Sequence, residues 1–188
     1  MNVSIDLRIE QVPGDNGAGE WLRIDEELHR AANEFARDVS AIVHGRVFYE
    51  TMEEFWPHSA SDPSLPDFLR EYGEIWKEKP KILVSRTRTS AEYSTRIIGD
   101  DAIQRLAEFR AATDGRIGVG GASLATQLLR AGLLDELLLW THPAYLGFGR
   151  TLFDDYDRPF DLELLDEARF ASGVTMRHYS ILLEGGVR

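Results

Sequence analysis

The chain has 188 residues, 43% hydrophobic and 28% charged, a length and composition typical of one soluble globular domain spanning residues 1–188. Its formal net charge of −11 argues against nucleic acid as a main partner, because duplex binding needs a surplus of lysine and arginine. The absence of cysteine, of a secretory leader and of any bilayer-length apolar run excludes disulfides, thiolate catalysis and membrane spans, and predicts a cytoplasmic location.

Helical and strand patterns alternate along the first half of the chain. Apolar residues recur at helical spacing after Asp25, and a short apolar run bounded by Gly45 is typical of a buried strand. The next helical pattern meets Pro57, which we expect to end it. The elements predicted in this half are a loop at 13–19, a helix at 25–38, a strand at 39–44, a helix at 47–56 and a loop at 58–66.

The second half continues the alternation and ends in a hairpin. Asp100 and Asp101 are good N-cap residues for a helix that Gly115 ends. Alternating strands and helices followed by antiparallel strands define an α/β fold with a mixed central sheet and a C-terminal antiparallel hairpin. The elements predicted here are strands at 81–85 and 96–98, a helix before Gly115, a strand at 116–119, a helix at 122–131, a strand at 136–141, and hairpin arms at 162–165 and 174–182 around a turn at 171–173.

A glycine pair, Gly120-Gly121, separates an apolar strand from a helix. Such a turn either lets a phosphate approach the backbone or only allows close packing of strand and helix, and the pattern alone leaves both interpretations open. A Rossmann fingerprint is disfavoured, because Ser123 stands where the third glycine is expected and no acidic residue ends the following strand.

Two further turns follow predicted strands and carry arginines. Gly45-Arg46 comes after the first buried strand, and Ser85-Arg86-Thr87 follows the second. If the strands are parallel neighbours, these turns meet Gly120-Gly121 at one edge of the sheet. Arg46 and Arg86 would then clamp a 2′-phosphate while the glycines take a pyrophosphate, although surface arginines are often merely solvated.

Motifs in the same order along the whole chain match one known family. They are 3–6 (VSID), 45–50 (GRVFYE), 56–57 (WP), 80–87 (PKILVSRT), 119–124 (VGGASL), 132–137 (GLLDEL), 143–149 (PAYLGFG) with 152–153 (LF), and 170–174 (FASGV). On these residues the chain resembles the dihydrofolate-reductase-like superfamily. It is most similar to stand-alone bacterial proteins related to the reductase domain of riboflavin-biosynthesis enzymes.

The resemblance implies a three-layer α/β/α fold, binding of NADPH and a homodimer. It implies an NADPH-dependent reductase acting on a pteridine- or aminopyrimidine-like heterocycle, similar to 5-amino-6-(5-phosphoribosylamino)uracil reductase or dihydrofolate reductase. The residues implied for the adenosine 2′-phosphate are Gly45, Arg46, Ser85, Arg86 and Thr87. Those implied for the pyrophosphate are Gly120, Gly121, Ala122 and Ser123, flanked by Val119 and Leu124.

Asp6 is the candidate catalytic carboxylate, because it lies in the matching N-terminal motif. The alternative is a strand-end aspartate that accepts hydrogen bonds from nearby backbone amides. The family usually has S-x-D-G at this point, whereas Leu7 follows Asp6 here. This departure keeps open a second function: a nucleotide-binding or regulatory homodimer that retains the fold without turnover.

The remaining chemistry-bearing residues give weaker signals. Glu26 and Glu27 lie on a predicted helix and are expected to be surface acids. The five histidines have no metal-ligand spacing, so no metal site is predicted. The run 137–140 predicts a strand covered on both faces, and the terminal hairpin is the better candidate for dimer contacts. Aromatic residues that form the core or line a heterocycle pocket are Trp21, Phe48, Tyr49, Phe55 and Trp56.

Overall fold

The structure is a computed structural model that describes residues 1–10, 19–93 and 95–182, and these form two compact units. The terminal unit consists of Met1–Asp25 and Thr126–Arg188, and the central unit of Glu26–Ala125. The chain passes from one to the other within helix α5 (Ala122–Arg130). The predicted loop at 13–19 lies outside the described residues except for Gly19, and the single domain stays a prediction.

The central unit is built on a four-stranded parallel sheet with the strand order β4-β3-β2-β5. The two inner strands, β2 and β3, are buried on both faces, since the consecutive residues Ile42 and Val43 and the consecutive residues Ile82 and Leu83 are all buried. Its elements are α1 (Glu26–Asp38), β2 (Ala41–Gly45), α2 (Arg46–Ser59), α3 (Asp67–Glu78), β3 (Lys81–Val84), β4 (Thr95–Ile98), α4 (Ala102–Ala112) and β5 (Ile117–Gly120).

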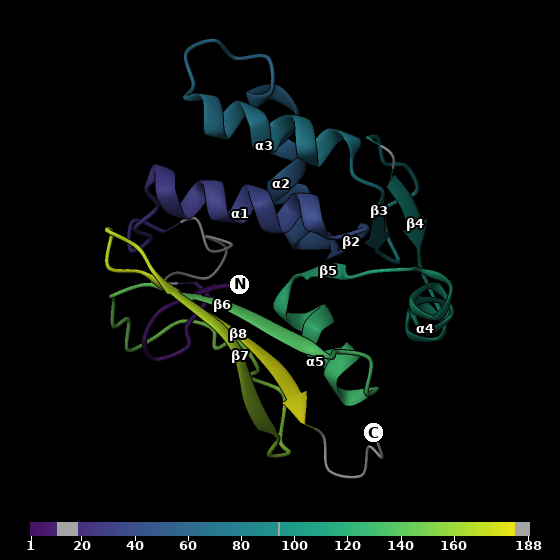
Figure 1. The fold of residues 1–188 in the computed structure, drawn as a ribbon. Coiled ribbons are helices and arrows are strands. Elements are labelled where there is room, and N and C mark those ends of the chain that lie inside the picture. The colour runs from purple at the N-terminus through teal and green to yellow at the C-terminus, as the bar shows by residue number, and fades with distance from the viewer. Residues whose placement is uncertain (11–18, 94, 183–188) are drawn as a thin grey trace. The chain divides into compact units, whose positions relative to one another are not determined.

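Helices α1, α2 and α3 pack together in the central unit (Figure 1). Two aromatic residues, Tyr49 from α2 and Trp76 from α3, are fully buried in the core that these helices form with the sheet. Leu83 from β3 is fully buried in the same cluster. Lys81, at the start of β3, is also buried, and its ammonium lies 4.6 Å from the centre of the Trp76 ring. This cation replaces lost water contacts by donating hydrogen bonds to main-chain carbonyls at the end of α3, among them that of Lys79 at 2.7 Å.

Three local features of this unit differ from the sequence predictions. Pro57 lies inside α2 instead of ending it, because a proline in the last turn forfeits only one helical hydrogen bond before the helix ends at Ser59. Helix α3 was not predicted from the sequence, and the loop expected at 58–66 begins at Ala60. Asp101 is the N-cap of α4, as expected, but it has a φ of 61° and makes no side-chain capping bond.

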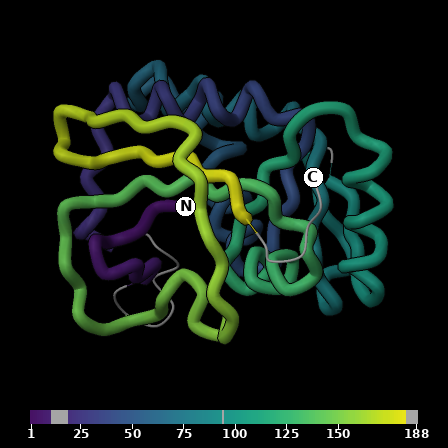
Figure 2. The backbone as a smooth tube through the Cα atoms, turned by 60° about the horizontal axis from the view of Figure 1, so that its bottom comes forward, coloured from purple at the N-terminus to yellow at the C-terminus, as the bar shows by residue number. Residues whose placement is uncertain are grey.

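The terminal unit contains a mixed sheet with the order β1-β6-β8-β7. Its strands are β1 (Asn2–Val3), β6 (Glu136–Thr141), β7 (Asp161–Arg169) and β8 (Thr175–Leu182). β1 runs parallel to β6, whereas β8 runs antiparallel to both of its neighbours, β6 and β7, and β7 and β8 form a long hairpin (Figures 1 and 2). Gly173 makes the hairpin turn with a φ of 85°. The α/β class and the C-terminal antiparallel hairpin are therefore confirmed, with the strands paired in two sheets.

A buried histidine joins separate segments of the terminal unit. His142, which follows β6, is fully buried and packs edge-to-face on Trp21 at a centroid distance of 5.4 Å. Its Nδ1 accepts a hydrogen bond from the Arg23 amide (2.9 Å), so its Nε2 carries the proton and donates to Asn2 Oδ1 (3.1 Å). Burial, with a smaller effect of nearby positive charges, lowers the pKa of His142 from 6.5 to about 4.

We expect His142 to make the protein less stable in mild acid. The unfolded chain binds more protons than the folded chain between the folded pKa of about 4 and the unfolded pKa of 6.5. The free energy of unfolding should therefore fall by up to ~3 kcal/mol as the pH drops through this window. Urea denaturation at a series of pH values measures the slope, and His142→Gln should flatten it. Equal slopes for the two proteins, or an NMR titration that charges His142 near pH 6.5, would contradict this assignment.

Candidate functional site

The three predicted turns lie at the carboxyl ends of the parallel strands, and this end of the sheet is called the carboxyl edge below. The register pairs Gly45 with Val84 and His44 with Gly120, so β2, β3 and β5 end level with one another. Because all three strands run in the same direction, the segments that leave them share this edge, which is where α/β folds bind nucleotides. A Cβ added to Gly121 would lie 3.5 Å from the amide nitrogen of Gly45, so two of the turns are in contact.

The glycine pair is required by the packing of this edge. Gly121 has a φ of 106°, which L side chains rarely adopt. A Cβ on Gly120 would overlap the Phe48 ring and would lie 2.7 Å from the His44 ring. The helix that follows begins with the hydrogen bond from the Ala125 amide to the Gly121 carbonyl (3.0 Å). Gly120 is buried, so close packing accounts for the first glycine, and Gly121 is the half-buried member of the pair.

The predicted flanking residues of the turn differ in exposure. Ala122 and Leu124 are buried, Ser123 is exposed and Val119 is half-buried. The Cβ of Leu124 lies 3.6 Å from the position that a Cβ on Gly45 would occupy, so the first turn of α5 packs directly on the start of α2. Gly45, which precedes α2, and Gly121, which precedes α5, have no side chain at this approach.

Ser85 shapes the second turn. Its hydroxyl accepts hydrogen bonds from the amides of Thr87 (3.2 Å) and Arg88 (3.0 Å), the geometry by which serine stabilises a tight turn. The side chains of Arg86 and Thr87 are left exposed by this turn. Within the described part of the chain, the Arg86 guanidinium has no ion pair, so it is the predicted cation that is available to an incoming anion.

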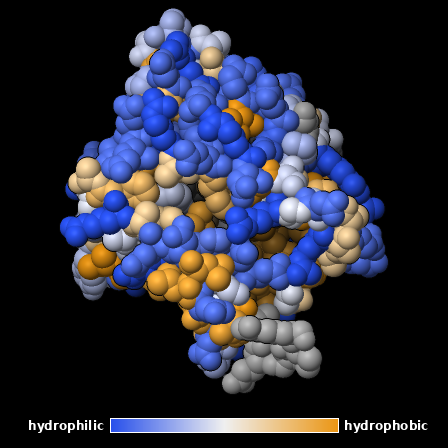
Figure 3. All heavy atoms as spheres, in the orientation of Figure 1, coloured by the Kyte–Doolittle hydropathy of each residue, from blue (hydrophilic) through white to orange (hydrophobic). Residues whose placement is uncertain are grey.

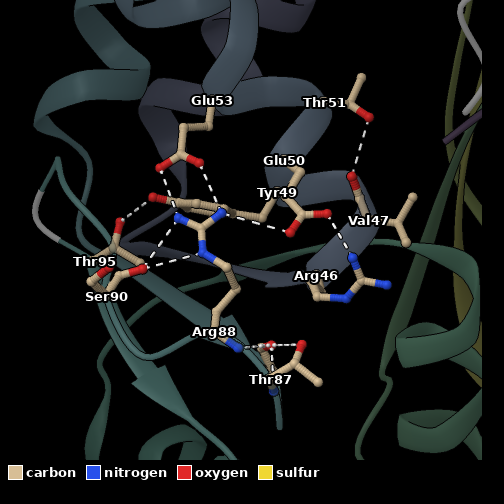
Figure 4. A network of polar contacts seen from close by, with 11 residues as sticks. Arg46, Val47, Tyr49, Glu50, Thr51, Glu53, Thr87, Arg88, Ser90 and Thr95 are labelled. Atoms are coloured by element: carbon tan, nitrogen blue, oxygen red, sulfur yellow. Dashed lines mark hydrogen bonds and ion pairs between the residues drawn. The ribbon is translucent and has the colours of Figure 1, made fainter.

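Arg46 and a further arginine, Arg88, belong to a charged network (Figure 4). Arg46, the first residue of α2, donates to Glu50 one turn later at 2.7 Å. Arg88 makes two hydrogen bonds to Glu53, of 3.1 and 3.4 Å, and these bonds are the main reason that its pKa is raised. Sequence reasoning missed Arg88, although it stands two residues after Arg86; its partner lies 35 residues away in the sequence, so only tertiary structure could reveal the pair.

His44 is a buried polar residue beside the glycine turn. It is 3% exposed, packs edge-to-face against Phe48, and its Nδ1 has no hydrogen-bond partner among the described residues. Burial, and to a lesser extent the charge of Lys81, lowers the pKa of His44 to about 3. The ring is therefore neutral at physiological pH and adds no positive charge to this edge.

Asp6, the predicted catalytic residue, lies in the terminal unit and has a structural set of partners. Its carboxylate accepts hydrogen bonds from the Ser4 hydroxyl (2.7 Å) and from the amides of Leu146 (3.1 Å) and Gly147 (2.9 Å). The Ser4 bond is the largest of the causes that lower the pKa of Asp6 to about 2. A carboxyl with this pKa is ionised at neutral pH, so the geometry supports the alternative of a backbone-tethering aspartate over a proton donor.

Leu7 has a backbone conformation that favours glycine. Its φ is 57°, in the left-handed region that glycine adopts without strain. The S-x-D-G pattern expected from the resemblance has a glycine at this position. The side chain of Leu7 is 47% exposed and gains little burial to offset the strain.

The remaining predicted candidates have ordinary roles. Glu26 and Glu27 are exposed on the first turn of α1, and Glu26 pairs with Arg30 at 2.8 Å. Tyr49 and Trp21 are buried in the cores of their units, whereas Phe55 is 44% exposed. Within residues 1–10, 19–93 and 95–182, no group of three or more acidic or histidine side chains is placed to hold a metal ion. The helices of these ranges are too short or too polar to cross a bilayer.

The sequence and the fold place the chain in a known class of proteins. The family model of the RibD C-terminal domain matches residues 1–176, so the chain belongs to that family. It is 28% identical over 180 residues to the uncharacterized protein YyaP of Bacillus subtilis (strain 168), covering 95% of this chain and 91% of YyaP. The resemblance inferred from the sequence motifs is confirmed.

Solved structures share the fold at low sequence identity. A protein assigned to riboflavin biosynthesis from Shewanella sp. PV-4 has a TM-score of 0.69 at 19% identity, with 96% of both chains covered. A pyrimidine reductase-like protein from Corynebacterium diphtheriae has a TM-score of 0.64 at 14% identity, covering 97% of this chain and 90% of that one. The chain matches 54% of the Thermotoga maritima diaminohydroxyphosphoribosylaminopyrimidine deaminase/5-amino-6-(5-phosphoribosylamino)uracil reductase, with a TM-score of 0.64 at 14% identity.

We expect Gly120→Ala to destabilise the protein by about 1–3 kcal/mol, because the new methyl group would overlap the rings of Phe48 and His44. Gly99→Ala is the matched control, since its Cβ would meet only the Ser85 carbonyl at 3.5 Å. Urea denaturation of both variants measures the difference. An equal loss of stability in the two variants would show that the close packing around Gly120 is not required.

Proposed function

We propose that the protein is an NADPH-dependent reductase of a pteridine- or aminopyrimidine-like heterocycle. The observation that carries this proposal is the meeting of three turns at the carboxyl edge of the parallel strands in a member of the RibD C-terminal domain family. Relatives of the same fold include proteins described as a pyrimidine reductase-like protein and as a 5-amino-6-(5-phosphoribosylamino)uracil reductase, which supports this substrate class.

The glycine turn suits a pyrophosphate. Gly120 and Gly121 present main chain without side chains, between Val119 and the first helical residues Ala122, Ser123 and Leu124. The N-cap of α2, Gly45, makes no side-chain capping bond, so the first turn of that helix also presents amides to this edge. Both helix N-termini carry partial positive charge, which favours an anion in a protein with an overall negative charge.

The two arginine turns suit the 2′-phosphate of the adenosine ribose. Arg86 is exposed, and Arg46 is 45% exposed and is bound to a single carboxylate. A surface ion pair of this kind is worth less than about 1 kcal/mol, so Arg46 can exchange Glu50 for a phosphate. Thr87 adds an exposed hydroxyl to the same turn, and Ser85 holds the turn in shape.

The bound dinucleotide would supply the hydride, and the protein would orient it against the acceptor. The residues of the central-unit edge bind and align the phosphates, which is the contribution that the chain itself makes. Asp6 is ionised and engaged by backbone amides, so the proton for the acceptor would come from water or another group. The same observation favours a second candidate function, a nucleotide-binding or regulatory protein without turnover.

We expect saturable binding of NADPH that is weaker for NADH and about tenfold weaker for NADPH in Arg86→Ala, because one charge-assisted contact is lost. Titration of the cofactor while following its fluorescence measures all three affinities. Arg158→Ala, which removes an exposed arginine of the terminal unit, is the control and should bind as the wild type does.

No saturable binding at millimolar NADPH would refute the proposed function altogether. Consumption of NADPH with a panel of pterins, flavins and aminouracils separates the two candidates: turnover supports the reductase, and binding without turnover supports the nucleotide-binding protein. Equal affinity of wild type and Arg86→Ala would remove Arg86 from the site.

We also propose that the protein is a homodimer, as the family resemblance implies. β7 is an edge strand whose leucines Leu162 and Leu164 stand opposite Ile181 and Tyr179 on one face of the hairpin. These leucines are 40% and 49% exposed, and apolar atoms gather over the hairpin on the surface shown in Figure 3. A second copy of the same hairpin suits this patch, since identical apolar faces are self-complementary about a two-fold axis.

Light scattering at low micromolar concentration should give twice the mass of one chain for the wild type and the mass of one chain for Leu164→Asp. A charge at the centre of an apolar contact is costly to bury, which is why one substitution should suffice. Ile24→Asp, at a residue that is 49% exposed elsewhere in the terminal unit, should leave the dimer intact. A monomeric wild type would exclude the homodimer.

A further inference from the structure

Glu50 connects the two guanidiniums at the arginine edge of the central unit. One carboxylate oxygen, Oε2, accepts the hydrogen bond from Arg46 at 2.7 Å. The other, Oε1, lies 3.6 Å from Nη1 of Arg88 (Figure 4). The Glu50 side chain is 37% exposed, so its charge faces the solvent from which a ligand would arrive.

Arg88 does not depend on Glu50. Its guanidinium makes two hydrogen bonds to Glu53 and two to the carbonyl of Ser90, of 3.1 and 3.3 Å. It also lies 5.8 Å from the centre of the Tyr49 ring, and its side chain is only 28% exposed. These contacts hold Arg88 in one position, where it joins the loop after β3 to α2.

Arg46 is held much less firmly. In the described ranges of the chain, its only recorded partner is Glu50, and its side chain is 45% exposed. An exposed pair of this type, four residues apart on a helix, adds little to stability. Arg46 is thus the cation of the network that can move most easily. To bind Arg46, a phosphate would have to displace the carboxylate of Glu50.

The charges of this network are balanced. Arg46 and Arg88 stand against the carboxylates Glu50 and Glu53, so of the three arginines only Arg86, in the neighbouring turn, is not offset within the network, whereas a phosphate monoester carries nearly two negative charges. In dinucleotide sites, an acidic residue near the ribose favours a 2′-hydroxyl, whereas an arginine accommodates a 2′-phosphate. Here Glu50 is an acidic residue of this kind and Arg46 is an arginine of this kind, and the two are hydrogen-bonded to each other.

We propose that Glu50 is a specificity-determining residue that limits the preference for a 2′-phosphorylated nucleotide over one with a 2′-hydroxyl. Glu50 competes with a 2′-phosphate for Arg46, and its negative charge repels the phosphate. The same carboxylate can accept a hydrogen bond from a 2′-hydroxyl. The wild type therefore accepts both nicotinamide dinucleotides with a modest preference for NADPH. This inference rests on the proposed function, because it needs a nucleotide at this edge.

The test compares dissociation constants of NADPH and NADH for the wild type, Glu50→Gln and Glu50→Asp by calorimetry. Glu50→Gln should bind NADPH about two- to fivefold more tightly, the effect expected when one exposed carboxylate no longer competes for Arg46. Its affinity for NADH should stay the same or fall. Glu50→Asp keeps the charge and should not improve NADPH binding, and the gain in Glu50→Gln should shrink at high salt.

Asp154→Asn is the matched control. It also removes a carboxylate that pairs with an arginine four residues away, at 3.3 Å from Arg150, but it does so in the terminal unit. It should leave the ratio of the two dissociation constants unchanged, whereas a change in net charge alone would move both variants equally. Circular dichroism checks that each variant is folded.

The outcomes separate the two proposals. If the wild type binds NADPH and Glu50→Gln leaves the ratio of the two dissociation constants unchanged or lowers the preference for NADPH, the role of Glu50 is refuted and the proposed function stands. If the wild type binds neither dinucleotide, the proposed function is refuted, and the role of Glu50 with it. A gain that appears equally in Asp154→Asn also refutes a specific role for Glu50.

Discussion

The parallel, level pairing of β2 with β3 and β5 is the constraint on which the candidate site depends. Parallel strands end at a common edge, so three turns that are separated by more than 30 residues in the sequence come together without any need for contacts between their side chains. The packing of the glycine turn against Phe48 and His44 then fixes how closely β5 approaches the start of α2. Ser85 and Gly120 are buried in the central unit, and turns anchored by buried residues are held in place by packing.

Electrostatics at this edge differ from those of the whole chain. A formal net charge of −11 opposes anion binding at long range, but the helix N-termini and Arg86 provide local positive potential. Glu50 and Glu53 offset part of it, and they do so unequally: Glu53 anchors Arg88, whereas Glu50 holds Arg46 loosely. The balance of these few charges, and not the net charge, governs how strongly a phosphate would be attracted.

Polar groups in the terminal unit are used mainly to join segments. Asp6 ties its own turn to the amides of Leu146 and Gly147, and His142 ties β6 to the segment around Arg23. Both are perturbed titratable groups, which are often taken as signs of catalysis, yet each shift here has a structural cause in hydrogen bonding or burial. A short aspartate motif is therefore weak grounds for assigning a proton donor in this family member.

The sequence by itself determined the order of most strands and helices, the hairpin and the turns that carry glycine or arginine, because periodicity, capping and turn chemistry are local properties. It missed α3, and it placed the end of α2 too early, because a proline in a last turn is tolerated when the rest of the helix packs well. Only the tertiary structure decided that Arg88 pairs with Glu53, that Asp6 meets Gly147 and that β7 is left at an exposed edge. These contacts join residues that are far apart in the chain, so they follow from strand register and packing, which no short stretch of sequence specifies.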